Sequence, residues 1–287
     1  MYEAEYYEKY KEGVRCTLCP HNCTISEGNT GFCGVRKNED GILYSTTYGY
    51  LSSVALDDIE KKPLNLFHPG SKILSIGSFG CNLSCGFCQN YMISKEYNFD
   101  VDTLEYIFPE NIIEAAIALK KEKNIGLAYT YNEPFINYEY VKNCSKLIKA
   151  NNLQNVLVTN GFINEEPLKD LLPYIDAANI DLKSFRNDFY AKVNGKLANV
   201  KKTIEIMNQM CHVEVTTLII PGENDSISEI EDLVIWLASV NRKIPLHISK
   251  FFPKYKYGNI KETSREKISE LCEVASKYLL HVYPGNV

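Results

Sequence analysis

The sequence has no long hydrophobic run and no hydrophobic N-terminal leader. Nowhere does it contain the roughly 18 consecutive apolar residues that a membrane-spanning helix needs. Its first residues, MYEAEYYEKYKEG, hold no apolar stretch and no small-residue cleavage site, so they do not look like a secretion signal. We therefore expect a cytoplasmic protein that does not associate with membranes.

The sequence also lacks an excess of positive charge. Its 31 lysines and arginines are outnumbered by 36 aspartates and glutamates, which gives a formal net charge of −5. A chain without a basic field cannot hold a polyanion, so we expect no nucleic acid partner. Hydrophobic residues make up 45% and charged residues 23%, as in an average globular protein. The 287 residues are enough for two domains or for one α/β barrel.

Cysteine is unusually frequent, with ten in the chain. Disulfide scaffolds are typical of short secreted chains, whereas clustered cysteines in a reducing compartment indicate metal or redox chemistry. Three cysteines, Cys144, Cys211 and Cys272, are isolated on or beside predicted helices and are expected to pack as small hydrophobes. The other seven lie in the first 88 residues: Cys16, Cys19, Cys23, Cys33, Cys81, Cys85 and Cys88.

Short apolar runs alternate with amphipathic helical patterns from residue 72 onward. Successive strand–helix units predict parallel strands with right-handed crossovers, and hence an α/β fold that is either a full or partial (β/α) barrel or a doubly wound sheet. Residues 1–71 differ, with four cysteines and short strand-like pieces such as 41–50, so we expect an N-terminal segment at 1–71 and a barrel at 72–287. The predicted strands are 72–79, 125–131, 155–160, 178–184, 213–220 and 245–252, and the predicted helices are 109–122, 136–151, 165–173, 197–210, 226–241 and 264–279.

Two of the predicted helices begin with capping-box spacing. Ser226 stands three residues before Glu229, and Thr263 three residues before Glu266. In a capping box the first side chain accepts a hydrogen bond from the backbone of the second residue. The pattern therefore places these two helix starts at Ser226 and Thr263.

Polar residues end each predicted strand. Because the carboxyl ends of parallel strands meet at one edge, where α/β proteins build their sites, these residues predict a shared pocket. They are Cys81, Asn132 with Glu133, Thr159 with Asn160, Asp181 with Lys183, Thr216 with Thr217, and Ser249.

Three cysteines follow the first barrel strand with the spacing Cys81-x3-Cys85-x2-Cys88. Three thiolates can bind one [4Fe–4S] cluster and leave its fourth iron open, and an open position is typical of a catalytic metal site. Gly80 and Gly86 allow the backbone to approach the cluster, and Phe87 would pack beside it. The alternatives are incidental buried cysteines, or a zinc site completed by a remote ligand.

This cysteine loop resembles that of the radical S-adenosylmethionine (SAM) superfamily, and residues 72–284 fit the superfamily's pattern. The resemblance implies a partial (β/α)6 TIM-like barrel with a [4Fe–4S] cluster after its first strand. It further implies that the amino and carboxylate groups of SAM chelate the open iron, and that one electron cleaves SAM into methionine and a 5′-deoxyadenosyl radical. That radical abstracts hydrogen from a substrate, here unknown, either a protein or a small molecule. An electron donor such as flavodoxin or ferredoxin is implied as a partner.

The resemblance also assigns roles to individual strand-end residues. Tyr131-Asn132-Glu133-Pro134 is similar in position to the segment that grips the SAM amino group, and the competing interpretation is an ordinary turn with Glu133 near a helix N-terminus. Thr159-Asn160-Gly161 resembles a turn beside the ribose in glycyl-radical-enzyme activases, and a plain Asn-Gly turn is the alternative. Asp181-Leu182-Lys183 matches the same relatives, although an Asp181–Lys183 ion pair would equally serve structure.

The last two strands supply three further candidate cofactor-binding residues. Thr217 precedes a segment, residues 219–225, that resembles the stretch bracketing the adenine and carboxylate. Ser249 and His247 are expected to face the pocket from the sixth strand. A lone strand histidine is more often a satisfied core residue than a catalyst, so His247 has a structural interpretation as well.

A second set of cysteines has the spacing Cys16-x2-Cys19-x3-Cys23-x9-Cys33. Four thiols within eighteen residues can close a structural zinc site or hold an auxiliary iron–sulfur cluster, and His21 could replace one ligand. A redox-active dithiol at Cys16 and Cys19 is the alternative. Together with the segment around 51–70 and the cysteine loop, this set resembles the radical SAM enzymes of the AmmeMemoRadiSam system, a group similar to pyruvate formate-lyase activating enzymes.

Two functions of different classes follow. The first is an oxygen-sensitive iron–sulfur oxidoreductase that cleaves SAM, with a glycyl radical activase as its narrower form. The second is a non-catalytic zinc-binding interaction protein in which both cysteine sets are structural. Metal content and colour after anaerobic purification discriminate between them.

Overall fold

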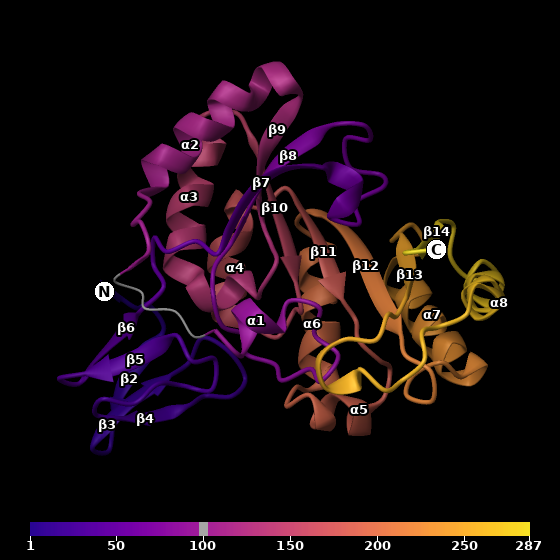
Figure 1. The fold of residues 1–287 in the computed structure, drawn as a ribbon, viewed down its shortest axis with the longest axis horizontal. Helices are drawn as coiled ribbons and strands as arrows, with labels where there is room; N and C mark the ends of the chain where they lie inside the picture. Colours follow the sequence, from indigo (N-terminus) through magenta and orange to yellow (C-terminus); the bar gives the residue numbers. More distant parts are fainter. Residues whose placement is uncertain (98–102) are drawn as a thin grey trace.

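The computed structural model describes residues 1–97 and 103–287 of the chain. Its centre is a curved eight-stranded sheet (Figure 1) with the order β14-β13-β12-β11-β10-β9-β8-β7. Strands β8 to β14 are parallel, and β7 lies antiparallel to β8. The strands are β7 (Ser53–Asp58), β8 (Lys72–Gly77), β9 (Asn124–Tyr129), β10 (Gln154–Thr159), β11 (Ala177–Asp181), β12 (His212–Ile219), β13 (Leu246–Lys250) and β14 (Val282–Gly285).

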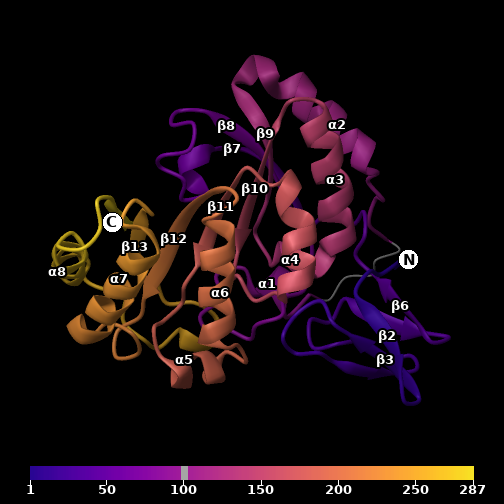
Figure 2. The same cartoon turned by 180° about the vertical axis from the view of Figure 1, so that it is seen from behind.

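Helices connect the parallel strands and cover the outer face of the sheet (Figure 2). Two short helices, α1 (Tyr91–Ser94) and α5 (Asn187–Lys192), lie beyond the carboxyl ends of the strands (Figure 1). The longer helices are α2 (Pro109–Ala118), α3 (Tyr138–Ala150), α4 (Glu165–Leu171), α6 (Leu197–Met207), α7 (Ile227–Asn241) and α8 (Arg265–Ala275). Single 3-10 turns add η1 (Ile59–Lys61), η3 (Leu119–Glu122), η4 (Pro134–Asn137), η5 (Leu172–Tyr174) and η6 (Tyr255–Tyr257).

The fold confirms the predicted α/β architecture. All six predicted strands are present, as β8 to β13. In the described residues β7 and β14 are the edges of the sheet and do not pair with each other, so the barrel is partial. Part of the N-terminal segment joins the barrel sheet, because β7 is hydrogen-bonded along β8. The division at residue 71 stays a prediction, and the structure places residues 53–71 with the barrel.

Helix starts follow local side-chain chemistry. Pro109 occupies the first turn of α2, where its missing N–H costs no hydrogen bond. Ser226 accepts a hydrogen bond from the backbone of Glu229, as its spacing predicts. The predicted cap at Thr263 is wrong, because Ser264 accepts from the backbone of Lys267 instead. The Thr263 hydroxyl is used elsewhere, donating to the carbonyl of Ile219 at the end of β12.

The segment between β7 and β8 fills the base of the barrel. Ile59 and Leu64 are fully buried against the inner faces of the strands, where they meet Ile73, Val156 and Ala177. Polar contacts fix this segment to the sheet: the backbone N–H groups of Asn65 and Leu66 donate to the buried carboxylate of Glu214. We refer to residues 59–67 as the base plug. The plug closes the amino ends of the strands and leaves the carboxyl ends for the site.

The N-terminal part forms two small antiparallel sheets beside the barrel (Figure 1). One has the order β2-β3-β4 and the other β1-β6-β5. A buried ion pair ties them to the barrel, since the Arg36 guanidinium lies 2.8 Å from the Glu139 carboxylate on α3. The strands are β1 (Tyr2–Glu3), β2 (Tyr7–Tyr10), β3 (Gly13–Cys16), β4 (Thr24–Ser26), β5 (Arg36–Glu39) and β6 (Ile42–Ser45).

Among the residues that the structure describes, no helix is long and apolar enough to cross a membrane. This agrees with the expectation drawn from the short apolar runs of the sequence.

Candidate functional site

The loop that carries Cys81, Cys85 and Cys88 leaves β8 at Gly77 and runs into α1. Gly80 adopts a φ of +82°, and a side chain there would come within 2.6 Å of the carbonyl oxygen of Cys33. Glycine is therefore required where the loop meets the N-terminal part. The residue that follows α1 is bonded back to the first cysteine: the Lys95 ammonium donates to the carbonyl of Cys81 at 2.7 Å.

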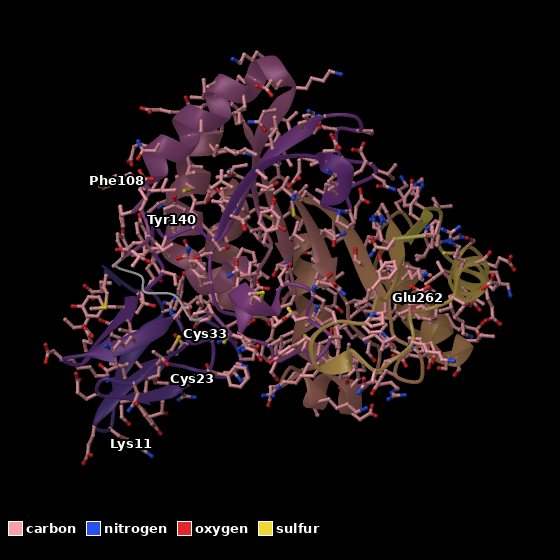
Figure 3. All side chains as sticks on the ribbon, viewed as in Figure 1. Lys11, Cys23, Cys33, Phe108, Tyr140 and Glu262 are labelled. Atoms are coloured by element: carbon pink, nitrogen blue, oxygen red, sulfur yellow. The ribbon has the colours of Figure 1, made fainter. Side chains whose placement is uncertain are left out.

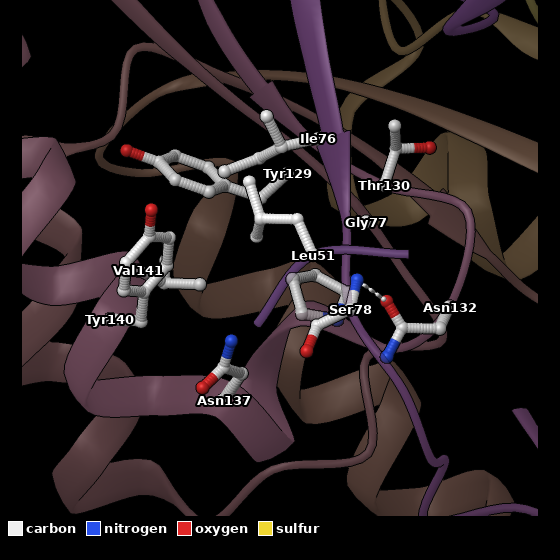
Figure 4. Close-up of a pocket in the computed structure, with 11 residues that line it drawn as sticks. Leu51, Ile76, Gly77, Ser78, Tyr129, Thr130, Asn132, Asn137, Tyr140 and Val141 are labelled. Atoms are coloured by element: carbon white, nitrogen blue, oxygen red, sulfur yellow. Dashed lines mark hydrogen bonds between the residues drawn. The ribbon is translucent and has the colours of Figure 1, made fainter. Parts of the chain in front are cut away.

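Asn132, predicted to bind cofactor, holds the start of this loop. Its side-chain oxygen accepts from the backbone N–H of Ser78 at 2.9 Å, as Figure 4 shows. Its side-chain nitrogen donates to the carbonyl of Gly80 at 3.1 Å. The two bonds bracket Phe79, so the end of β9 fixes the residues that lead into Cys81.

The cysteines of the loop are partly buried, and their thiols are close enough to influence one another. Burial raises the pKa of Cys81 to about 12 and that of Cys85 to about 11. Donors nevertheless surround the sulfur atoms: the backbone N–H of Leu83 lies 3.3 Å from Cys81 Sγ, and the Ser94 hydroxyl 3.2 Å from Cys88 Sγ. Such contacts stabilise thiolates once a cationic centre has displaced their protons.

Three thiols on one short loop suit a [4Fe–4S] cluster, in which separate irons are bound by different thiolates. A closed zinc site would need a fourth ligand. In the described ranges, 1–97 and 103–287, no group of three or more histidine, cysteine, aspartate or glutamate side chains is placed to hold one metal ion.

The Glu133 carboxylate is hydrogen-bonded to neighbouring protein groups. Its carboxylate accepts from the Thr159 hydroxyl at 2.7 Å, from the Asn160 backbone at 2.8 Å and from the Phe135 backbone at 3.0 Å. Burial raises the pKa of Glu133 to about 7 although these donors favour the charged form. The residue joins the ends of β9 and β10 and caps η4, which is the structural alternative drawn from the sequence. Its predicted contact with the SAM amino group stays a prediction.

Asn160 reaches the cysteine loop from β10. Its side-chain nitrogen donates to the side-chain oxygen of Asn82 at 2.9 Å and lies 3.7 Å from Cys81 Sγ. Asn82 in turn donates to the carbonyl of Phe162 at 2.7 Å. The Thr159-Asn160-Gly161 turn therefore supports the first cysteine directly.

Asp181 and Lys183 form an ion pair at the end of β11, with 2.9 Å between the carboxylate and the ammonium. Burial opposes the charge of Lys183, but Asp181 and the Cys85 thiol outweigh it and raise the pKa of the lysine. The same ammonium offsets part of the rise that burial gives to the pKa of Cys85. Lys183 thus brings a positive charge beside the cysteine loop, where a thiolate-bound cluster would carry negative charge.

The predicted residues on β12 and β13 lie on different faces of the sheet. Thr217 lies on the outer face and donates to the carbonyl of Leu182 at 2.9 Å. Thr216 is opposite His247 in the register and faces the inside. His247 is bound to the Glu214 carboxylate at 2.6 Å, so it has a structural partner below the site. Ser249 stands two residues further along the inner face.

The sequence pointed to Thr217 as a cofactor-binding residue, but its neighbour Thr216 is the threonine that faces the inside of the barrel. Its hydroxyl is buried and has no hydrogen-bond partner among the residues that the structure describes, which leaves an unsatisfied polar atom on the inner wall. Strand alternation could have identified it, because Thr216 is paired with Asp181 on β11 and so lies on the same face.

A separate cavity lies outside the barrel (Figure 4). It encloses about 260 Å³, part of it open to solvent, between β8, β9 and α3. Ile76, Tyr129 and Val141 give it an apolar lining, and no cysteine contributes to it. Gly77, Ser78 and Asn132 also line it, so one end of the cavity adjoins the start of the cysteine loop.

Two of the N-terminal cysteines, Cys23 and Cys33, are seen in Figure 3 where the small sheets meet the barrel. Cys16, Cys19, Cys23 and Cys33 all line one small cavity, together with His21 and Arg36. His21 contacts the cysteine loop, since its Nε2 lies 2.8 Å from the carbonyl oxygen of Asn82. The described structure has all ten cysteines as free thiols.

A model of the radical SAM superfamily matches residues 75–237, which is more than half of the chain. The chain belongs to the radical SAM superfamily. The matched range begins in β8 and includes the cysteine loop and strands β9 to β12. Members of this superfamily are enzymes that use a [4Fe–4S] cluster and SAM, so the expected cofactors are confirmed at the level of the superfamily.

Two relatives from Methanocaldococcus jannaschii have similar sequences. An uncharacterised protein is 40% identical, over 100% of this chain and 86% of its own length. A 7-carboxy-7-deazaguanine synthase is 24% identical, over 73% of this chain and 86% of its own length.

Solved radical SAM structures share the fold. A radical SAM methyltransferase from Sphaerobacter thermophilus has a TM-score of 0.56 at 16% identity, over 76% of this chain and 67% of that one. A domain of a pyruvate-formate lyase-activating enzyme from Bacteroides vulgatus has a TM-score of 0.50 at 16% identity, over 56% and 99%. Streptococcus suis SuiB bound to SAM has a TM-score of 0.54 at 15% identity, over 74% of this chain and 51% of that one.

Proposed function

We propose that the chain cleaves SAM reductively at a [4Fe–4S] cluster bound by Cys81, Cys85 and Cys88. The observation that carries the proposal is the placement of these three thiols, with their N–H and O–H donors, beyond the first strand of a radical SAM barrel. When bound there, the cluster supplies the electron that breaks the carbon–sulfur bond of SAM and yields a 5′-deoxyadenosyl radical for hydrogen abstraction.

The chain's own residues would hold and orient these groups. Asn132 and Asn160 fix the two ends of the first-cysteine region by hydrogen bonds to Gly80 and Asn82. Lys183 offsets the negative charge of thiolates near Cys85. Thr216, with an unused buried hydroxyl on the inner face, offers a hydrogen bond to a ligand in the barrel. Rigid placement of this kind is what the protein contributes to cofactor chemistry.

The loop after β13 would cover the cluster site through its contacts with the cysteine loop. The backbone N–H of Lys256 donates to the carbonyl of Gly86 at 2.9 Å. The ring of Tyr257 packs on Phe87 with 5.7 Å between the centroids. The cysteine loop is thereby held between the N-terminal part and this second loop, which restricts the access of water to the cluster.

The test is SAM cleavage by the anaerobically purified, iron- and sulfide-reconstituted chain with dithionite as reductant. Wild-type protein and the Cys272→Ser control should form 5′-deoxyadenosine, and the triple variant Cys81→Ala, Cys85→Ala, Cys88→Ala should form none. Cys272 is a matched control because it is a free thiol on α8, remote from both cysteine sets. Product formation by the triple variant would place the cluster elsewhere. A colourless protein that contains only zinc would favour the non-catalytic interaction protein.

The narrower proposal is a glycyl radical activase, which acts on a protein and draws its electron from a flavodoxin or ferredoxin. The Thr159-Asn160-Gly161 and Asp181-Leu182-Lys183 segments support it by their resemblance to such activases. A small-molecule substrate is the competing form, because one relative is named as a 7-carboxy-7-deazaguanine synthase. Following deuterium between labelled substrate candidates and 5′-deoxyadenosine decides between them: label entering from a protein glycine supports the activase.

A further inference from the structure

The four N-terminal thiols surround a single cavity. Cys16 ends β3, Cys19 and Cys23 lie in the turn toward β4, and Cys33 comes three residues before β5. The backbone N–H of Cys16 donates to the carbonyl of Cys23 at 3.0 Å, which brings these two residues opposite each other. All four cysteines line the cavity, although they come from separate turns of the chain. Their convergence is therefore a product of the fold and not only of sequence spacing.

Backbone donors point at the sulfur atoms of this set. The N–H of His21 bonds Cys19 and that of Val35 bonds Cys33, in each case two residues after the cysteine. The N–H of Phe32 lies 3.4 Å from Cys23 Sγ. Amide donors at this position stabilise the charged form of a thiolate ligand. A set of four thiols that only filled space would not need them.

The cavity wall also contains an unused donor. Arg36 lines the cavity and is 1% exposed. Its terminal nitrogens are bonded to the Glu139 carboxylate and to the carbonyl of Glu5, but within the described part of the chain its Nε has no hydrogen-bond partner. A buried N–H without an acceptor is costly, and a guanidinium N–H most of all. A negatively charged acceptor in the cavity would satisfy it.

We propose that Cys16, Cys19, Cys23 and Cys33 bind a second iron–sulfur cluster, of the [4Fe–4S] type. Four thiolates complete such a cluster, unlike the three of the first site. Four thiolates can also bind a single zinc ion, and metal analysis distinguishes the two.

The second site adjoins the first. A carbon atom added to Gly80 would lie 2.6 Å from the carbonyl of Cys33, so the residues before Cys81 touch the residues around Cys33. The Lys95 ammonium spans both sites, donating to the carbonyl of Cys81 and lying 4.7 Å from the centre of the Phe32 ring. Two paramagnetic clusters at such adjoining sites should interact magnetically.

Metal analysis of the reconstituted full chain tests the proposal. We expect about eight iron atoms and eight sulfides per wild-type chain, and about four of each after Cys81, Cys85 and Cys88 are all replaced by alanine, as two [4Fe–4S] clusters require. Cys19→Ala with Cys33→Ala should also leave about four, and the Cys272→Ser control about eight. One zinc per chain that survives in the Cys81, Cys85, Cys88 variant, or no metal there at all, would overturn the proposal.

A measurement on the wild-type chain avoids the risk that the N-terminal variants fail to fold. After full reduction with dithionite, electron paramagnetic resonance should give a broadened spectrum from two interacting [4Fe–4S]⁺ clusters. The variant that lacks Cys81, Cys85 and Cys88 should give the unbroadened spectrum of one cluster. A wild-type spectrum that integrates to a single isolated cluster would contradict a second one. SAM cleavage is not part of this readout, and the variant that lacks Cys81, Cys85 and Cys88 tests the second cluster separately from the proposed function.

Discussion

Individual amide side chains fix the cysteine loop. Asn132 bonds backbone groups on both sides of Phe79, and Asn160 bonds Asn82 beside the first cysteine. Both are strand-end residues that the sequence marked as cofactor ligands. Their hydrogen bonds to protein give them a positioning role, which does not depend on any direct contact with SAM. This distinction yields a prediction for Asn132.

Replacing Asn132 by alanine removes both bonds that lead into Cys81. The expected loss in unfolding free energy is about 1–3 kcal/mol, the contribution of two hydrogen bonds of which the partners are partly buried. The rate of 5′-deoxyadenosine formation should fall, whereas Asn132→Asp should keep the bond from Ser78 and retain more activity. Urea denaturation and the cleavage assay check this. Asn151→Ala, on an exposed amide, is the control, and equal effects of the two alanine variants would contradict the assignment.

Glu214 is a buried carboxylate with four donors. Burial opposes its ionisation, but His212, His247 and the backbone N–H groups of Leu66 and Asn65 outweigh it and lower the pKa of Glu214 to about 2. Unfolded chains have a glutamate pKa of about 4.3. A depressed pKa stabilises the folded state above the unfolded value, and this contribution is lost as the pH falls toward the folded value.

Acid should therefore destabilise the wild-type chain more steeply than a Glu214→Gln variant. Between about pH 5 and pH 2, the wild type should lose about 2–3 kcal/mol that the variant does not lose, the equivalent of a two-unit pKa difference. Urea denaturation curves at several pH values measure it. Parallel pH profiles of the two proteins would show that Glu214 does not carry this dependence.

Sequence reasoning located the cysteine loop because its signal is local: three cysteines at fixed spacing after an apolar run. It could not rank Thr216 against Thr217, since that choice depends on which face of β12 points inward. Nor could it see that the Glu133 carboxylate is satisfied by Thr159 and Asn160, because these contacts join residues from different strands. Side-chain roles that depend on register need the sheet.

At the scale of elements, the base plug shows how a short segment completes the barrel. Leu64 is fully buried in it, whereas Leu66 is 41% exposed two residues later. The backbone of Leu66 is nevertheless fixed by its bond to Glu214. The two leucines are two residues apart in the chain, but the side chain of Leu64 is in the core and that of Leu66 is largely in water.

Leu64→Ala should cost about 2–5 kcal/mol in unfolding free energy, because it leaves a cavity among the inner faces of the strands. Leu66→Ala should cost less than about 1 kcal/mol, since its side chain is largely in water and its backbone bond remains. Urea denaturation of the two variants side by side provides the test. Equal losses would mean that the plug does not pack as described.

The two strands of the barrel sheet that the sequence did not predict, β7 and β14, are both edges. β14 is four residues long and contains Pro284, and proline is depleted in strands. β7 ends in Asp57 and Asp58, and it precedes a turn-rich segment that suggested a separate unit. The six central strands were predictable because both of their faces are buried, which makes them continuous apolar runs.

At the scale of the whole molecule, the N-terminal sheets and the barrel are joined by buried charge. The Arg36 and Glu139 side chains are 2% and 0% exposed, and Glu139 also accepts from the backbone of Glu5. Removing one partner of a buried ion pair leaves an uncompensated charge. The two parts should therefore unfold together.

Glu139→Gln should cost about 3–5 kcal/mol, the usual penalty for breaking a buried pair. The exposed pair between Lys169 and Glu165 provides the control, and Glu165→Gln should leave the free energy of unfolding nearly unchanged. Circular dichroism and tyrosine fluorescence should follow one transition in the wild type. Two separate transitions in the wild type, or a small loss in Glu139→Gln, would contradict the coupling.

The open sheet has a consequence for how copies of the chain behave toward each other. Each edge strand offers unpaired backbone groups to which a second molecule could add a strand, the first step of edge-to-edge aggregation. Both edges are protected: Pro284 removes a donor from β14, and Asp57 and Asp58 put carboxylates on β7, where Lys62 holds Asp57 at 2.6 Å. The barrel can therefore stay open without an edge strand to which a second copy of the chain would readily pair.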